Sequence, residues 1–122
     1  MEKKEKTVKE KAEGLVFIVA RGETKGTVFP IEPGENFIGR WDPDKGAFPE
    51  IDLDAHDPEA KISRRHALLR FENGQLFIED IGSMNGTFVN RGARLKQGDR
   101  VALKEGDEVV VGKTFLRLER VG

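Results

Sequence analysis

The chain has 122 residues, which is enough for one domain, and its 21 basic and 22 acidic residues give a formal net charge of −1. This balance argues against a protein that coats nucleic acid, because such proteins usually carry a basic excess. The lack of cysteine excludes disulfide scaffolds and thiol nucleophiles, and no apolar run approaches the roughly 18 residues that cross a bilayer. With no signal-peptide pattern either, the sequence predicts a cytoplasmic protein without a membrane or nucleic-acid partner.

Residues 1–13 differ in composition from the rest of the chain. Nine of these thirteen residues are Lys or Glu, and this density of charge favours a solvated segment over a packed one. We therefore predict a charged, flexible N-terminal tail at residues 1–13 and one folded domain at residues 14–122.

Short apolar runs rich in β-branched and aromatic residues follow Gly14, and turn residues separate them. Asn73-Gly74 predicts a tight hairpin, and Pro30 predicts an edge or strand-end position because it lacks an N–H donor. The segment 40–65, with three prolines and many acidic side chains, is predicted to be irregular. The pattern indicates an all-β sandwich or barrel, with strands at residues 15–20, 26–31, 36–39, 66–71, 75–78, 87–90, 99–103, 107–111 and 114–118.

Three of the predicted loops concentrate groups that bind phosphate. They hold guanidinium groups, a serine hydroxyl, an asparagine amide and a histidine, at residues 39–40, 61–66 and 80–87. Arginine presents a fork of N–H donors that matches phosphate oxygens, and serine adds a short hydroxyl donor. Because the loops at one end of a sandwich often carry function, these segments together predict an anion-binding site.

The order of these motifs resembles the signature of the forkhead-associated (FHA) domain. The matching segments are Gly-Arg at 39–40, Ser-Arg-Arg-His at 63–66 and Ser-Met-Asn-Gly-Thr at 83–87. The resemblance covers nearly all of the chain beyond the tail. It implies a two-sheet β-sandwich of about eleven strands whose end loops bind phosphothreonine peptides, with no catalytic activity and no cofactor. The implied partners are a Thr-phosphorylated protein and an upstream Ser/Thr kinase.

The resemblance also implies a role for each polar residue of the loops. Arg40 and Ser63 would contact the phosphate, and Arg64 would contact the phosphate or the peptide backbone. Asn85 would hydrogen-bond the peptide main chain beside the phosphothreonine. Lys61 would assist phosphate binding or contact a side chain after the phosphothreonine.

Other loop residues would shape the site or depart from the family pattern. Met84 stands where the family often has Ser or Thr, so only its backbone N–H can donate, and we include it among the binding residues. Arg64 and Arg65 are expected to point to opposite faces of a strand, so that only Arg64 faces the ligand. The residues expected to support the site from below are Gly39, His66, Gly86 and Thr87.

The residues of these loops favour phosphate binding over catalysis or metal binding. Ser63 and His66 lack the strained turn or activating frame of a nucleophilic serine. Asp42-x-Asp44-x-Gly46 breaks the calcium-loop pattern at its third ligand, so the acidic stretch predicts no metal site. Its charge should instead disfavour acidic peptides and favour basic residues beside the phosphothreonine.

Two alternatives stay open beside a monomeric phosphothreonine-binding adaptor. The first is a phospho-independent interaction or dimerisation domain, to which Met84 points. The second is a regulatory module of a larger enzyme, to which the charged N-terminus points as a linker. The resemblance adds a possible regulatory site at Thr7, because some small bacterial relatives bind their own phosphorylated N-terminal tail.

Overall fold

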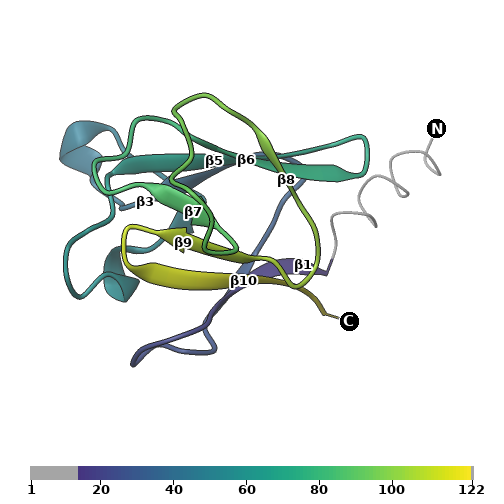
Figure 1. Ribbon diagram of the computed structural model, residues 1–122. Helices are drawn as coiled ribbons and strands as arrows, with labels where there is room; N and C mark the ends of the chain where they lie inside the picture. The colour runs from purple at the N-terminus through teal and green to yellow at the C-terminus, as the bar shows by residue number, and fades with distance from the viewer. Residues whose placement is uncertain (1–13, 122) are drawn as a thin grey trace.

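A computed structural model describes residues 14–121 of the chain, so the predicted tail and its Thr7 lie outside the described residues. The described part forms ten strands in two five-stranded sheets packed face to face (Figure 1). The first sheet has the order β2-β1-β10-β9-β7, with β1 (Leu15–Val19), β2 (Val28–Pro30), β7 (Thr87–Val89), β9 (Glu108–Val111) and β10 (Thr114–Arg120). The second has the order β4-β3-β5-β6-β8, with β3 (Gly34–Gly39), β4 (Ile51–Asp52), β5 (Arg65–Glu72), β6 (Gln75–Asp80) and β8 (Val101–Leu103).

The core lies between the two sheets, where the alternating residues of each strand meet. In β3, for example, Ile38 is fully buried whereas its neighbour Phe37 faces outward, as the period of two in a strand requires. Phe17 and Leu116 from the first sheet join Ile38, Leu69 and other residues of the second sheet in one hydrophobic cluster. The predicted all-β sandwich is therefore confirmed.

Several predicted boundaries need correction. Residues 40–65 are not wholly irregular, because Ile51–Asp52 forms β4 and pairs in parallel with β3. A two-residue strand with a partner 13 residues earlier leaves no periodic pattern to detect. The predicted strand 99–103 begins only at Val101. Pro30 ends β2, which is an edge strand, as predicted.

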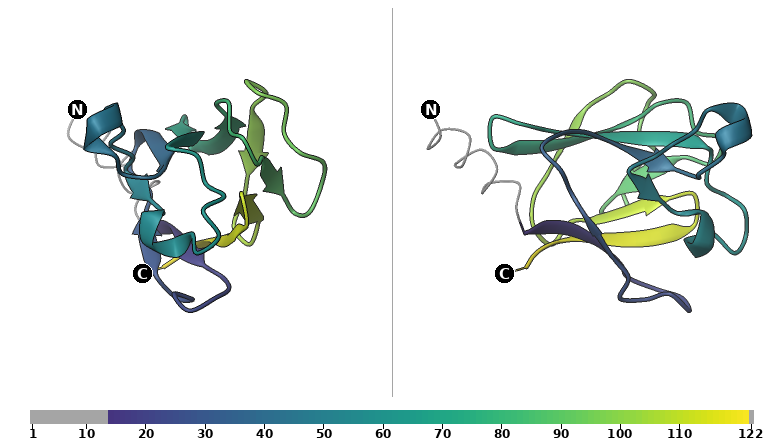
Figure 2. Two further views of the ribbon diagram at one scale, coloured as in Figure 1. Left: turned by 90° about the vertical axis from the view of Figure 1, so that its left-hand side faces the viewer. Right: turned by 180° about the vertical axis from the view of Figure 1, so that it is seen from behind.

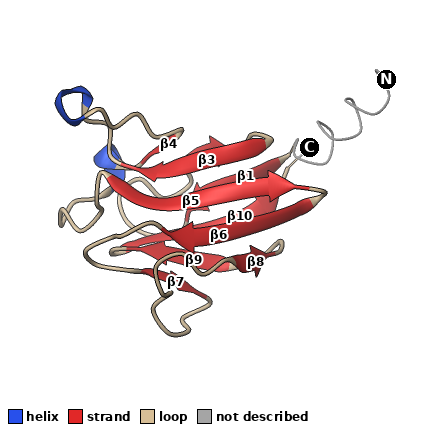
Figure 3. Cartoon of the chain, turned by 90° about the horizontal axis from the view of Figure 1, so that it is seen from above, coloured by secondary structure: helices blue, strands red, loops and turns tan. Residues whose placement is uncertain are grey.

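Two short 3₁₀ turns, η1 (Pro43–Lys45) and η2 (Asp54–His56), lie in the long segment between β3 and β5. Figure 3 shows both turns in blue at the same end of the sandwich. The right-hand view of Figure 2 shows that the two ends of the described chain lie at the opposite end of the sandwich. No helix of the described residues is long and apolar enough to span a membrane.

A bulge at the start of β5 changes the direction of the side chains at this end of the sheet. Ile38 pairs with Ala67 and Gly39 pairs with Arg65, so His66 is the extra residue on β5. A bulge bends the strand locally and redirects its side chains. His66 and Ala67 are both fully buried as a result, and the His66 ring points inward beneath the loops.

Candidate functional site

The end of β3 places Arg40 against the segment that precedes β5. Gly39 allows this approach, because a Cβ at Gly39 would lie only 1.8 Å from the carbonyl oxygen of Arg64. The backbone N–H of Arg40 donates to that carbonyl at 3.1 Å, and Arg40 Nε donates to the carbonyl of Ile62 at 2.6 Å. The Arg40 guanidinium is thus fixed beside the segment that holds Ser63, with 30% of its side chain exposed.

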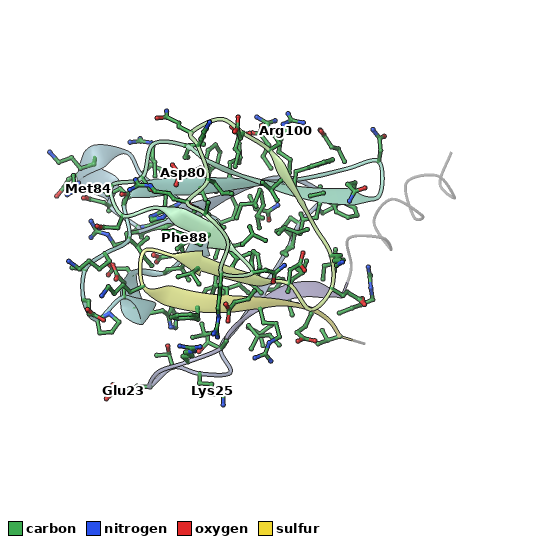
Figure 4. The ribbon with its side chains drawn as sticks, viewed as in Figure 1. Glu23, Lys25, Asp80, Met84, Phe88 and Arg100 are labelled. Carbon is green, nitrogen blue, oxygen red and sulfur yellow. The ribbon has the colours of Figure 1, made fainter. Side chains whose placement is uncertain are left out.

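The Ser63 hydroxyl is oriented by the loop that follows β6. The backbone N–H of Met84 donates to Ser63 Oγ at 3.0 Å. A hydroxyl has one hydrogen and two lone pairs, so this bond leaves the Ser63 hydrogen to donate, and the described residues provide no acceptor for it. The Met84 side chain is 80% exposed and lies at the left-hand end of the molecule in Figure 4.

His66 connects these loops from inside the domain. Its Nδ1 accepts the backbone N–H of Ser63 at 3.0 Å, and its Nε2 lies 2.8 Å from the carbonyl of Gly86. Because Nδ1 accepts, the proton of the neutral ring is assigned to Nε2, which donates to Gly86. Burial outweighs the Gly86 hydrogen bond and lowers the pKa of His66 below its ordinary value of 6.5. The ring is therefore neutral at pH 7.

A second bridge joins the same loops at Lys61 and Asn85. Asn85 Nδ2 donates to the carbonyl of Lys61 at 3.0 Å, and the backbone N–H of Lys61 donates to the carboxylate of Asp57 at 2.8 Å. Gly112 lies against the same peptide, because a Cβ there would be 2.6 Å from the Lys61 oxygen. These contacts leave the Lys61 ammonium and Asn85 Oδ1 without a partner among residues 14–121.

The loop between β6 and β7 folds around the buried carboxylate of Asp80. Its Oδ1 accepts the backbone N–H groups of Gly82 at 2.8 Å and Ser83 at 2.9 Å. Its Oδ2 accepts the hydroxyls of Ser83 at 2.5 Å and Thr87 at 2.7 Å. Burial alone would raise the pKa of Asp80, but these four hydrogen bonds outweigh it and lower the pKa below its ordinary value. A charged carboxylate thus fixes the loop that presents Met84.

Arg64 and Arg65 both reach the turn at residues 42–46. Arg64 Nε donates to the carboxylate of Asp42 at 2.5 Å, and Arg65 Nη2 donates to the carbonyl of Gly46 at 3.0 Å. Strand alternation does not govern this pair, because β5 begins only at Arg65 and the bulge follows directly. The hydrogen bond from Arg64 lowers the pKa of Asp42 below its ordinary value.

Other carboxylates of the same segment bind backbone or the predicted phosphate-binding arginine. Asp52 Oδ1 accepts the backbone N–H groups of Trp41 at 3.0 Å and Asp54 at 3.1 Å. Asp54 Oδ1 in turn lies 3.8 Å from Nη1 of Arg40. The acidic segment therefore places the Asp54 carboxylate beside Arg40 and the Asp42 carboxylate on Arg64. An anionic ligand would compete with these two carboxylates for the arginines.

The family model of the FHA domain matches residues 36–112 of the chain. The chain belongs to the FHA domain family. This confirms the resemblance found in the sequence, and the function predicted from it, phosphothreonine-dependent recognition, is the function of that family.

Known FHA proteins resemble the chain in sequence and in structure. The glycogen accumulation regulator GarA of Mycolicibacterium smegmatis is 38% identical over 98 residues, which cover 80% of this chain and 54% of that protein. The oxoglutarate dehydrogenase inhibitor of Corynebacterium efficiens is 35% identical over 102 residues, covering 84% of this chain and 63% of that protein. The FHA domain of human APLF, in complex with an XRCC1 bisphospho peptide, has a TM-score of 0.64 and 26% identity, covering 88% of this chain and 99% of that chain. This FHA chain spans about half to two-thirds of the length of the two curated relatives.

The structure of this FHA domain brings all the binding residues predicted from the sequence to one end of the sandwich, and it gives supporting contacts to Asp80, Ser83 and Arg94, to which the sequence analysis assigned no individual role. Asp80 and Ser83 form the hydrogen-bonded base of one loop. Arg94 Nη2 donates to the carbonyls of Ser83 at 2.8 Å and Met84 at 3.2 Å. An Asp two residues before a Gly is a signal for a side-chain-bonded turn, so Asp80 had a sequence signal. Arg94 had none, because its partners are backbone carbonyls.

Proposed function

We propose that Arg40 and Ser63, whose hydroxyl is oriented by the backbone N–H of Met84, form the phosphate pocket of a phosphothreonine-binding adaptor. The Ser63 hydroxyl is the observation that carries the proposal. One lone pair of its oxygen accepts the Met84 N–H, and its hydrogen remains for an anion, beside the Arg40 guanidinium that the Ile62 carbonyl holds in place. Charge-assisted hydrogen bonds from such preorganised donors are about twice as strong as neutral ones, and the fixed loops limit the ordering cost of binding.

The peptide around the phosphothreonine would meet the unpartnered groups next to this pocket. The hydrogen bond from Asn85 Nδ2 to the Lys61 carbonyl fixes the orientation of the Asn85 amide. Asn85 Oδ1 is therefore available to accept a backbone N–H of the peptide. The Lys61 ammonium adds positive charge at the same rim. Arg64 Nε is engaged by Asp42, so Arg64 would contact the phosphate or the peptide through its terminal nitrogens.

The chain acts, in this proposal, through recognition alone. It is a monomeric cytoplasmic module that is not an enzyme, its partner is a protein phosphorylated on threonine, and a Ser/Thr kinase acts upstream. The names of the two curated relatives support a regulatory role, because one is a regulator and the other an inhibitor of a metabolic enzyme.

Calorimetric titration with matched peptides tests the proposal. Phosphothreonine peptides from a degenerate library should bind saturably, phosphoserine versions about fivefold more weakly because one methyl contact is lost, and unphosphorylated versions not measurably. Arg40→Ala should weaken phosphothreonine binding by about 30-fold or more, because a charged hydrogen bond that offsets phosphate desolvation is removed. Arg117→Ala, which changes a half-exposed arginine on β10, is the matched control and should change nothing. Equal binding of phosphorylated and unphosphorylated peptides would refute the proposal.

A further inference from the structure

Three aromatic side chains are exposed beside the proposed phosphate pocket. Trp41 is 51% exposed, Phe48 is 56% exposed and Phe37 is 36% exposed. Trp41 directly follows Arg40, and its ring meets that of Phe48 edge to face with centroids 5.1 Å apart. Single exposed apolar residues are common on protein surfaces, but a group of large aromatic residues at a binding site marks a surface for an apolar ligand.

The turn that carries two of these rings is held rigidly. Asp42 and Ala47 exchange two backbone hydrogen bonds of 2.9 Å each, and η1 closes the turn between them. Arg64 holds the Asp42 carboxylate, and Arg65 holds the carbonyls of Lys45 and Gly46. The backbone of Trp41 is also held from the other side, by the carboxylate of Asp52. Rings on a backbone fixed in this way lose little further freedom when a ligand covers them.

A hollow of about 290 Å³ lies between this turn, β3 and the start of β5. Its lining includes the apolar residues Phe37, Ala47, Phe48 and Pro49 and the charged residues Glu50, Arg64 and Arg65. The polar groups already have partners, since Glu50 Oε1 accepts the backbone N–H of Phe37 at 2.6 Å and the arginines hold the turn. The part of the hollow that still lacks a partner is apolar, and the hollow is large enough to receive one or two side chains.

Arg64 joins this hollow to the proposed phosphate pocket. It lines the hollow, and its carbonyl accepts the backbone N–H of Arg40. An extended peptide advances about 3.3 Å per residue, so four residues on either side of a phosphothreonine bound at Arg40 cover about 13 Å in each direction.

We propose that this hollow, together with the ring of Trp41, binds one apolar side chain of the phosphopeptide that flanks the phosphothreonine. The inference rests on the proposed function, because the phosphate contact is what brings the flanking residue to the hollow. It assigns to Phe48 and Trp41 the selection among phosphothreonine sites, a role separate from that of the arginines. It also shifts the expected sequence preference from charge alone to an apolar residue at one fixed position.

The test is a positional series of phosphothreonine peptides measured by fluorescence anisotropy. Each of the four positions on either side of the phosphothreonine is Leu in turn, in an otherwise alanine background. The wild type should prefer Leu at one position by about tenfold, equivalent to about 1.4 kcal/mol. Phe48→Ala and Trp41→Ala should each reduce this preference to about twofold or less and leave the affinity for the all-alanine phosphopeptide unchanged. Val28→Ala, which shortens an equally exposed side chain on β2, should keep the preference intact.

The possible failures are distinguishable. If the wild type binds no phosphothreonine peptide, the proposed function and this inference both fall. If it binds phosphopeptides without an apolar preference, or keeps that preference in both aromatic variants, the hollow is not a subsite and the phosphate pocket stands. Sedimentation velocity provides a further check: a wild-type dimer that Phe48→Ala dissociates would assign the hollow to a second copy of the chain and overturn the inference. Thermal unfolding of each variant shows whether its fold is intact.

Discussion

Acidification below the ordinary histidine pKa of 6.5 should destabilise the domain through His66. The buried ring accepts an N–H from Ser63 on one nitrogen and donates to Gly86 from the other, so an added proton would place two donors head to head at 3.0 Å. This agrees with the lowered pKa of His66, which burial causes. The unfolded chain, with a His pKa near the ordinary value of 6.5, therefore binds this proton more readily than the folded domain.

The sign and size of the effect follow from this difference. Stability is complete above the unfolded pKa of 6.5 and is lost as the pH falls from there toward the lowered folded pKa. Each pH unit in that window costs up to about 1.4 kcal/mol, so lowering the pH from about 7.5 to about 5.5 should cost at most about 1.4 kcal/mol if His66 stays neutral throughout. A smaller loss would mean that the folded pKa lies inside this range.

Urea unfolding across this pH range measures the loss, and NMR titration of the imidazole resonances assigns it. The chain has only two histidines, which makes the control simple. His56→Gln should keep the pH dependence attributed to His66, whereas His66→Gln should abolish it. A stability that is flat over this range in the wild type, or a His66 that titrates at its ordinary pKa in the folded domain, would refute the reasoning.

Three further perturbations test other parts of the site. Asp54→Asn should strengthen phosphothreonine-peptide binding by about two- to fivefold at low salt and less at high salt, because it removes a carboxylate that competes with the phosphate for Arg40. Weaker binding in a titration would contradict this. Gly39→Ala should lower the melting temperature and abolish peptide binding, since its Cβ would lie 1.8 Å from the Arg64 carbonyl oxygen. Gly92→Ala, whose Cβ would lie 3.2 Å from the Val89 carbonyl oxygen, should lower the melting temperature less and leave binding intact. Asp80→Asn should cost about 2–4 kcal/mol in urea unfolding, because it removes the charge that four hydrogen bonds stabilise and replaces the oxygen that accepts the Ser83 and Thr87 hydroxyls by an NH2 group that cannot accept them.

Much of the site could be predicted because its chemistry restricts the residue types. A phosphate needs forked cationic donors and hydroxyl or backbone N–H groups, and Arg40 and Ser63 occur where the family motif expects them. The contribution of Met84 was predicted only as a backbone donor, and the structure places that N–H on the Ser63 hydroxyl. The pairing of Arg64 with Asp42 was not predicted, because these residues lie 22 positions apart and no local pattern links them.

The sequence by itself determined the all-β class and the family. Short β-branched runs between turn residues can form strands wherever they pack. The order and spacing of the Gly-Arg, Ser-Arg-Arg-His and Asn-Gly motifs can be read directly from the sequence, without the fold. Only the tertiary structure decided which donors stay available. The Ser63 hydroxyl hydrogen stays available because the Ser63 oxygen accepts the backbone N–H of Met84, 21 residues away. Arg40 forms an ion pair with Asp54 because the folded acidic segment lies beside it. Local backbone preferences are encoded residue by residue, whereas hydrogen-bond partners depend on distances that exist only after two sheets have packed and their loops have met.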